Sequence, residues 1–342
     1  MEDKTNGIFP MECINKDSAS FANVLALILV TSLNAIFFPM KHLTKLVTLL
    51  LILPLSAKGQ TFTDSLGGGL EAHEKIPFKT VSGDVTELNL HLFYPPDYDP
   101  NNTYPAIVLF FGGGWNGGSA SHFFTHASYL SSRGMVVICP DYRTKQSHGA
   151  LPYQCVEDGK AAMRFVRANA KKLGIDPDWI AAGGGSAGGH VATATATLDR
   201  FDAGKNLDVS CVPNALVLFN PVYDNGPNGY GYERVKDYWE FFSPMNNIDA
   251  DHPPAIVFFG DNDNLVPVAT AEAYQRSMHE FEIRSELHVF SGEEHGFFNW
   301  NRDKSPNKAN YVATLIATDA FLSSLGYLDG EERVVEWLAP HR

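Results

Sequence analysis

The stretch "WIAAGGGSAGGHVATATATL", residues 179–198, decides the fold because it joins an apolar run to an alanine-rich run through a glycine-rich turn around one serine. Glycine loses more conformational freedom on folding than any other residue, so this many glycines need a structural reason. Residues 184–188 match G-x-S-x-G, with a predicted strand before the motif and a predicted helix after it. A sharp turn in that setting lifts the hydroxyl of Ser186 above the sheet edge. A phosphate-binding loop would need a lysine here, and the stretch has none; the other alternative is a tight connection around a spectator serine.

Strand-like and helix-like segments alternate outward from this turn. Apolar or alternating runs predict strands at 85–95, 104–114, 135–143, 179–185, 215–222, 254–261 and 285–292. Apolar residues at helical spacing predict helices from near Tyr153 to Gly174, through 269–281 and through 309–326. This alternation indicates a mostly parallel sheet with helices on both faces, with functional groups on the loops at the carboxyl ends of the strands.

The first 59 residues have the pattern of a leader. Residues 40–59 combine a basic start, a short apolar run and small residues before Gln60, which predicts a secretory signal peptide. Residues 1–39 are interpreted as an upstream mis-start, and the alternative is a membrane anchor formed by the apolar run at 21–38. Residues 60–342 are predicted to form a single catalytic domain that is secreted or periplasmic.

Composition and charge restrict the partners of this chain. A hydrophobic content of 44% and a charged content of 19% are those of an ordinary globular protein. A net charge of −13 argues against nucleic acid or an anionic membrane as the main partner, and no stable membrane association is expected after removal of the leader. Without the leader three cysteines remain, Cys139, Cys155 and Cys211, and their spacing indicates neither a disulfide framework nor a zinc knuckle.

A reactive serine needs a base, and the base needs an orienting carboxylate. Downstream of Ser186, Asp261 and Asp263 follow a predicted strand, and His295 lies in a loop after the last one. Hydrolases of this topology place serine, acid and histidine in the same order. A calcium loop at 261–266 is excluded because Leu265 and Val266 stand where a ligand and a glycine belong. The alternative for His295 is a surface histidine.

The stretch "LFFGGGWNGGS", residues 109–119, follows a predicted buried strand and offers backbone N–H groups for an oxyanion hole at Gly112, Gly113 and Gly114. A second source of such a donor is Ala187, directly after the serine. The same stretch also matches the dinucleotide fingerprint G-x-G-x-x-G, with Asp141 ending the next strand. Against that alternative, a strand already precedes this one, whereas the fingerprint usually opens the sheet.

Five segments together, "FFGGGW", "PDYR", "CVEDGKAAMRFVRANAKKLGIDPDWIAAGGGSAGGH", "GDNDNLVP" and "EEHGFFN", resemble the α/β-hydrolase superfamily. Within it the chain resembles the hormone-sensitive-lipase-like and acetyl-esterase group, which includes secreted bacterial carbohydrate esterases, over about residues 78–328. The resemblance implies that Ser186 is the nucleophile, His295 the base and Asp263, rather than Asp261, its partner. It also implies that the oxyanion hole is formed by Gly113, Gly114 and Ala187.

Two positions depart from the family pattern. Phe111 stands where the family usually has a histidine, and Gly185 stands where the group often has an acidic residue. The first departure puts the ordering of the oxyanion loop in doubt. A large N-terminal cap is not expected, and the aromatic-rich stretch 223–252 is the longest irregular segment. Trp115, Tyr230 and Trp239 are predicted to line a substrate pocket, with the alternative that such rings seal a loop onto the core.

These features predict a serine esterase that acts through an acyl-enzyme without cofactor or metal. The resemblance implies small-molecule or saccharide esters as substrates, with short acyl groups such as acetyl on carbohydrates or plant-derived compounds. A prolyl-oligopeptidase-like serine peptidase is one alternative, but that class usually carries a propeller domain for which this chain has no room. The other alternative is a non-catalytic binding protein on the same fold.

Overall fold

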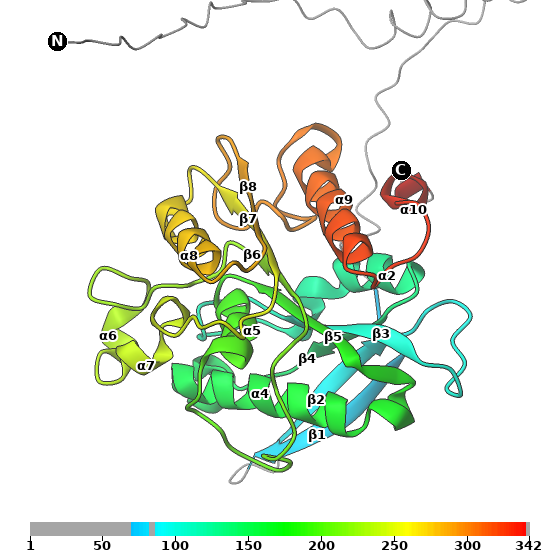
Figure 1. Cartoon of the computed structure of the whole chain (residues 1–342), viewed down its shortest axis with the longest axis horizontal. Helices are drawn as coiled ribbons and strands as arrows, with labels where there is room; N and C mark the ends of the chain where they lie inside the picture. The colour runs from blue at the N-terminus through cyan, green and yellow to red at the C-terminus, as the bar shows by residue number, and fades with distance from the viewer. Residues whose placement is uncertain (1–69, 82–85, 340–342) are drawn as a thin grey trace, which may run out of the picture. The chain divides into compact units, whose positions relative to one another are not determined.

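The computed structural model describes residues 70–81 and 86–339. The predicted leader (1–59) and the apolar run at 21–38 lie outside the described residues. The described part contains an eight-stranded sheet in the order β1-β2-β4-β3-β5-β6-β7-β8 (Figure 1). Its strands are β1 (Glu74–Val81), β2 (Thr86–Phe93), β3 (Tyr104–Phe110), β4 (Val136–Pro140), β5 (Ile175–Gly185), β6 (Leu216–Phe219), β7 (Ala255–Gly260) and β8 (Ser285–Phe290).

The direction of the strands divides the sheet in two. β1 and β2 pair antiparallel, and so do β2 and β4, whereas every pair from β4 through β8 is parallel. The inner parallel strands are mostly apolar because both of their faces are covered, as in β4, in which all five residues are buried. The edge strand β8 is only partly buried. The predicted, mostly parallel α/β sheet is confirmed.

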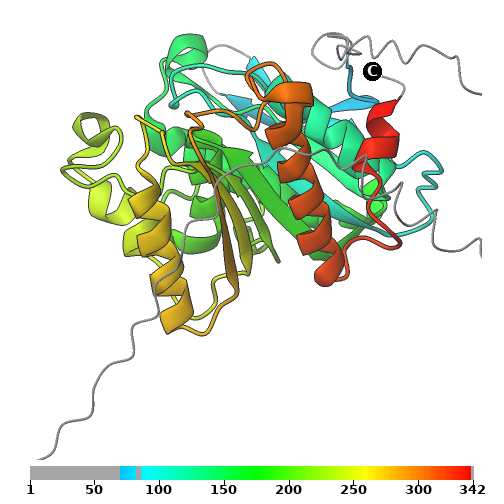
Figure 2. The ribbon, with the colours of Figure 1, turned by 90° about the horizontal axis from the view of Figure 1, so that it is seen from above.

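Helices cover both faces of the sheet (Figures 1 and 2). One face carries α4 (Pro152–Ala168), α5 (Ala187–Thr197) and α8 (Val268–Glu280), and the other carries α2 (Phe124–Ser132), α9 (Ala309–Ser324) and α10 (Val334–Leu338). The short helices are α3 (Lys145–His148), α6 (Tyr232–Val235) and α7 (Trp239–Phe242), with 3₁₀ turns η2 (Ala120–Phe123), η3 (Ala170–Leu173), η4 (Pro244–Asn246) and η5 (Pro306–Lys308).

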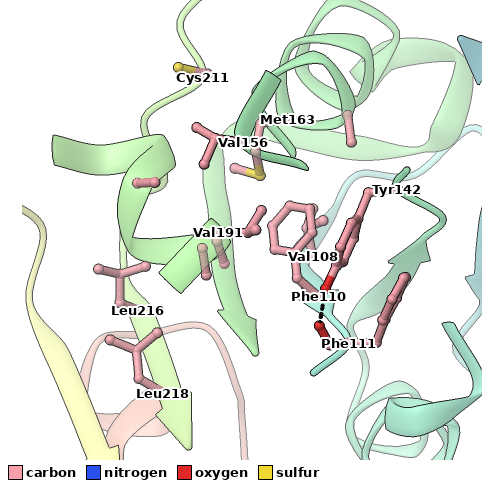
Figure 3. Packing of buried hydrophobic residues seen from close by; sticks show 14 of the residues in the cluster. Val108, Phe110, Phe111, Tyr142, Val156, Met163, Val191, Cys211, Leu216 and Leu218 are labelled. Atoms are coloured by element: carbon pink, nitrogen blue, oxygen red, sulfur yellow. Dashed lines mark hydrogen bonds between the residues drawn. The ribbon is translucent and has the colours of Figure 1, made fainter. Parts of the chain in front are cut away.

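Two hydrophobic cores form because side chains of a strand alternate between faces. Val108 and Phe110 of β3 point into the core under α4 and α5, where Figure 3 shows them beside Val156, Met163 and Val191. The intervening residues of β3, Ile107 and Leu109, belong to the core under α2, α9 and α10. The central parallel strands are thus buried from both sides, which makes them a rigid base for the loops at their carboxyl ends.

Among the elements of eight or more residues, β1 and α2 were not predicted from the sequence. β1 is an edge strand whose residues are only half-buried or exposed, and it contains Pro77, so its pattern is weak. α2, with the sequence FTHASYLSS, has little helical amphipathicity because polar residues of this helix are buried as well. The stretch 223–252, predicted to be irregular, contains only the single-turn elements α6, α7 and η4.

The three cysteines outside the predicted leader are buried free thiols. Burial raises the pKa of the thiols of Cys139, Cys155 and Cys211 above the ordinary value. Among the described residues, no helix has the length and the apolar character that a membrane span requires.

Candidate active site

A cavity of about 850 Å³ lies where the loops after the parallel strands meet. Its lining includes the loop after β3, Ser186 after β5, Asn220 after β6 and His295 after β8. The full lining is Leu70, Gly112, Gly113, Gly114, Asn116, Gly117, Gly118, Ser119, Ser121, His122, Phe124, Thr125, Gln146, Ser186, Asn220, Tyr230, Leu265, His295, Gly296, Phe298, Asn299, Trp300, Asn301 and Arg302. A cavity of this volume accommodates a small molecule of several rings.

The turn between β5 and α5 holds Ser186 in a strained backbone conformation, with φ 55° and ψ −121°. The Ser186 N–H donates to the carbonyl of Phe219 at 2.9 Å, and the Ser186 carbonyl accepts from the His190 N–H at 3.0 Å, which begins the helix. Gly188 is required because a Cβ there would lie 2.1 Å from the Phe110 carbonyl oxygen. The turn is therefore held by main-chain contacts that leave no room for larger residues.

Asp263 orients His295. The Nδ1–H of His295 donates to Oδ2 of Asp263 at 2.6 Å, and the carboxylate side chain is fully buried. The other oxygen, Oδ1, accepts from the backbone N–H groups of Leu265 at 2.9 Å and Val266 at 3.0 Å. Asp261 is not part of this arrangement, since its carboxylate accepts from the Gly292 N–H at 2.6 Å. The structure thus brings His295 to Asp263 and not to Asp261.

Ser186 and His295 line the same cavity, but within the described part of the chain no hydrogen bond joins their side chains. The side-chain amide of Asn220, which is fully buried, instead lies 3.2 Å from Nδ1 and 3.3 Å from Nε2 of His295. With Nδ1–H directed at Asp263, Nε2 is the atom that accepts a proton. Because the Asn220 amide is almost equidistant from the two ring nitrogens, it lies over the ring and not along the lone pair of Nε2. The bond from the Ser186 hydroxyl to Nε2 is of the kind that commonly forms only with substrate present.

The oxyanion loop, residues 111–118, is held by its carbonyl groups. The Gly113 carbonyl accepts from the N–H groups of Asn116 at 3.0 Å and Gly117 at 3.3 Å, and the Gly114 carbonyl accepts from Nη1 of Arg234 at 2.6 Å. The N–H groups of Gly113 and Gly114, in contrast, donate to no other described residue.

The N–H groups of Gly113 and Ala187 are available for different reasons. Gly113 has φ 125°, and a Cβ there would lie 2.2 Å from the Gly117 carbonyl oxygen. Ala187 is the first residue of α5, so its N–H lacks a partner within the helix. The three predicted donors are therefore free to bind a negative charge.

Phe111 and His122 together explain how the loop is ordered without the usual family histidine. Phe111 stacks on Tyr142 with ring centroids 3.9 Å apart, and the Tyr142 hydroxyl donates to the Phe111 carbonyl at 2.5 Å, as Figure 3 shows. The Gly112 N–H donates to Nδ1 of His122 at 2.9 Å. Burial lowers the pKa of His122 to about 4, so its ring is neutral at pH 7 and can accept this bond.

Of the three predicted pocket aromatics, Tyr230 lines the cavity and the two tryptophans do not. Trp115 is 1% exposed and packs beneath the loop, with its ring 5.1 Å from that of His190 and 5.6 Å from that of Phe242. Trp239 packs against the hydrophobic core instead. Neither tryptophan is thus among the residues that line the cavity: Trp115 is buried against His190 and Phe242, and Trp239 lies half-buried at the start of α7. Burial of these rings removes apolar area from water.

The dinucleotide alternative does not agree with the geometry. Asp141 lies at the antiparallel side of the sheet, where it pairs with Nε2 of His91 at 3.0 Å and accepts from the Asn89 N–H at 3.2 Å. An acidic residue that binds a ribose would need a free carboxylate. Among the described residues, no group of three or more His, Cys, Asp or Glu side chains could hold a metal ion.

Three residues of the site were missed by the sequence analysis: His122, Asn220 and Arg234. His122 and Arg234 lie in segments without a recognisable motif, and only the fold brings them to the loop. Asn220 lies within the predicted strand 215–222, but the observed strand β6 ends one residue before it. There Asn220 adopts φ 34°, a conformation that asparagine tolerates better than most residues.

Comparisons with known proteins agree with this geometry. A family model described as BD-FAE matches residues 90–215, and one described as dienelactone hydrolase family matches residues 230–325. The chain is 29% identical to the probable carboxylic ester hydrolase LipM of Mycobacterium tuberculosis, over 54% of this chain and 47% of that protein. It is 29% identical to the acetylxylan esterase of Xylanibacter ruminicola, over 56% of this chain and 41% of that protein. The chain therefore spans about half the length, or less, of these curated relatives.

A solved structure matches over a larger share. The apo form of Thermogutta terrifontis esterase 2 is 37% identical, superposes with a TM-score of 0.72, and the match covers 78% of this chain and 99% of that one. The sequence identity and the coverage of this match agree with three features of the structure, which are the sheet order, the strained serine turn and the Asp263–His295 pair. The chain belongs to the esterases of the α/β-hydrolase superfamily, in the hormone-sensitive-lipase-like group.

Proposed function

We propose that this chain hydrolyses short-chain carboxylic esters through an acyl-enzyme formed on Ser186. The observation that carries the proposal is a single cavity that contains the strained Ser186 and His295, with the buried Asp263 bound to His295. A hydroxyl at such a turn projects from the backbone toward the cavity, where a neutral imidazole can accept its proton.

The reaction follows from the position of each group. Nε2 of His295 takes the proton of the Ser186 hydroxyl as Oγ attacks the ester carbonyl carbon, and Asp263 stabilises the imidazolium that forms. The N–H groups of Gly113, Gly114 and Ala187 bind the oxygen that becomes negative. The C–O bond then breaks, the alcohol leaves with the proton from Nε2, and water hydrolyses the acyl-enzyme by the same steps.

Contacts around the serine favour a small acyl group. A Cβ on Gly112 would lie 3.4 Å from Cβ of Ser186 and 3.2 Å from Cε1 of His122, and one on Gly185 would lie 2.4 Å from Cζ of Phe298. Gly112, His122 and Phe298 therefore pack closely around the turn that carries the nucleophile. Thermogutta terrifontis esterase 2 has been solved with butyrate and with propionate bound, and the Xylanibacter relative is an acetylxylan esterase.

A saccharide is the alcohol that the rest of the cavity favours. Many of its side chains carry amide or hydroxyl groups suited to sugar hydroxyls: Asn116, Ser119, Ser121, Thr125, Gln146, Tyr230, Asn299 and Asn301. Export from the cytoplasm belongs to the same proposal and rests on the signal-peptide pattern of residues 40–59. N-terminal sequencing of secreted material tests it, with a mature chain starting near Gln60 expected.

The test of the proposal uses 4-nitrophenyl acetate. Ser186→Ala is expected to lower kcat by at least about 10⁴-fold with an unchanged circular dichroism spectrum, because only the nucleophilic oxygen is lost. Asp263→Asn is expected to lower kcat about 10³- to 10⁴-fold, and Asp261→Asn, a matched control two residues away, only a few-fold. Full activity of Ser186→Ala would overturn the proposal, and a panel of acetylated, feruloylated and alkyl esters then ranks the substrates.

A further inference from the structure

The charge of the cavity is opposite to that of the chain. The whole chain has a net charge of −13, yet no aspartate or glutamate is among the residues that line the cavity. Of those lining residues, Arg302 alone carries a full positive charge at neutral pH. The cavity lining thus has one guanidinium and no carboxylate, although the chain as a whole is acidic. This charge distribution favours the binding of an anion in the cavity.

Arg302 lies beside the histidine of the site. A Cβ on Gly296 would lie 3.2 Å from both Cδ and Nη1 of Arg302, so the side chain packs over the residue that directly follows His295. Burial is the main cause of the lowered pKa of His122, and the charge of Arg302 adds to it. The positive charge of the Arg302 guanidinium therefore acts on His122, which also lines the cavity.

Arg302 differs from the other cations of its loop because, among the described residues, its side chain has neither a carboxylate partner nor a carbonyl acceptor. Lys304 pairs with Glu294 at 3.8 Å, and Nζ of Lys308 donates to the Asp303 carbonyl at 2.9 Å. Throughout residues 70–81 and 86–339, no carboxylate lies within ion-pair distance of the Arg302 guanidinium, which is exposed to the cavity. Its five N–H donors are thus available to a ligand.

We infer that Arg302 binds a carboxylate on the alcohol part of the ester, so that the enzyme prefers acetylated acidic sugars or acetylated hydroxy acids over neutral esters. This inference rests on the proposed function. The leaving alcohol takes its proton from Nε2 of His295, so it lies on the histidine side of Ser186, which is where Arg302 lies. A guanidinium matches a carboxylate with two parallel hydrogen bonds.

The test compares an anionic ester with a neutral one of similar size, 4-acetoxybenzoate and 4-acetoxybenzamide, with the 3-acetoxy isomers as a second pair. For each protein the measured quantity is the ratio of kcat/KM for the anionic ester to kcat/KM for the neutral one, since this ratio cancels effects on folding and on the chemical step. Arg302→Gln is expected to lower the ratio about five- to tenfold relative to the wild type. Arg302→Lys is expected to retain part of the preference, and Arg302→Glu to lower the ratio further.

Lys304→Gln is the matched control. Lys304 lies two residues after Arg302 and outside the cavity lining, and this substitution also removes one positive charge. It is expected to leave the ratio unchanged. Equal ratios for the wild type, Arg302→Gln and Arg302→Glu would overturn the inference while leaving the esterase proposal intact. Absence of hydrolysis of all four esters and of 4-nitrophenyl acetate would instead overturn the proposed function itself.

Discussion

The serine turn and the oxyanion loop face the same cavity but are held in different ways. The turn at 184–188 is positioned by main-chain contacts, such as those of Ser186 with Phe219 and of Gly188 with Phe110. The oxyanion loop at 111–118 is positioned largely by side chains that come from other segments, namely His122, Tyr142 and Arg234. Backbone N–H groups of Lys145 and Gln146 add two bonds to its carbonyls. The comparison teaches that one half of the site is held by main-chain atoms of neighbouring strands, whereas the other half also depends on side chains from distant segments.

The largest effect is expected from a methyl group in the serine turn. Gly188→Ala would place Cβ 2.1 Å and 2.3 Å from the carbonyl oxygens of Phe110 and Phe111, and main-chain atoms at the end of a buried strand cannot move away. We expect loss of soluble protein or a fall in Tm of more than about 10 °C. Gly149→Ala is the matched control, because Gly149 has φ 62° but no atom within 4 Å of an added Cβ. Gly149→Ala should lower the free energy of unfolding by only about 1 kcal/mol.

If both glycine variants lose the same stability, the close approach of α5 to β3 is not what holds the turn. Chemical denaturation followed by tryptophan fluorescence measures both variants on one scale.

Acidification is expected to act on the oxyanion loop and not on the serine turn, whose five residues carry no titratable side chain. Burial lowers the pKa of His122 from 6.5 to about 4, so the unfolded chain binds more protons than the folded one between these values. The contribution of the neutral ring to the free energy of unfolding is complete above pH 6.5. It is lost as the pH falls from 6.5 through 4, and the loss amounts to about 3 kcal/mol.

The variant that tests this is His122→Leu, which should flatten the dependence of unfolding free energy on pH between 6.5 and 4. Burial also lowers the pKa of His126 and of His190, each to about 3, so a slope remains in the variant. His126→Leu is the control, since it should flatten the slope similarly without touching Gly112. At pH 8, only His122→Leu should lower kcat, about tenfold, because Gly112 loses its acceptor. An unchanged slope in His122→Leu would contradict the assignment.

The smallest effect is expected from Tyr142→Phe. The stack of ring 142 on Phe111 remains, and only the hydrogen bond from the hydroxyl to the Phe111 carbonyl is lost. We expect a loss of about 1 to 2 kcal/mol in the free energy of unfolding and a fall in kcat of no more than about threefold. A hundredfold fall in kcat would mean that this one bond, and not the set of side-chain contacts, positions the loop.

Most of the fold could be predicted because the parallel strands are short apolar runs buried on both faces. β1 and α2 could not, since the first is an edge strand with Pro77 and the second buries polar residues such as His126. At the site, the G-x-S-x-G motif and the order of Asp263 and His295 carried enough local information to predict the residues that the structure brings together at the cavity. The tryptophans Trp115 and Trp239 show the limit, because residue type alone does not tell a pocket wall from a core contact.

The sequence by itself determined the layered α/β architecture, the strained turn at Ser186 and the candidates for its acid and base, because strand burial and glycine sterics act over a few neighbouring residues. The tertiary structure brings Asp263 rather than Asp261 to His295, as the family resemblance had implied. Only the tertiary structure decided that His122 and Arg234 hold the oxyanion loop. It also decided that Arg302 faces the cavity without an acidic partner. These contacts join side chains far apart in the chain, and their geometry depends on how the sheet and its loops pack in three dimensions.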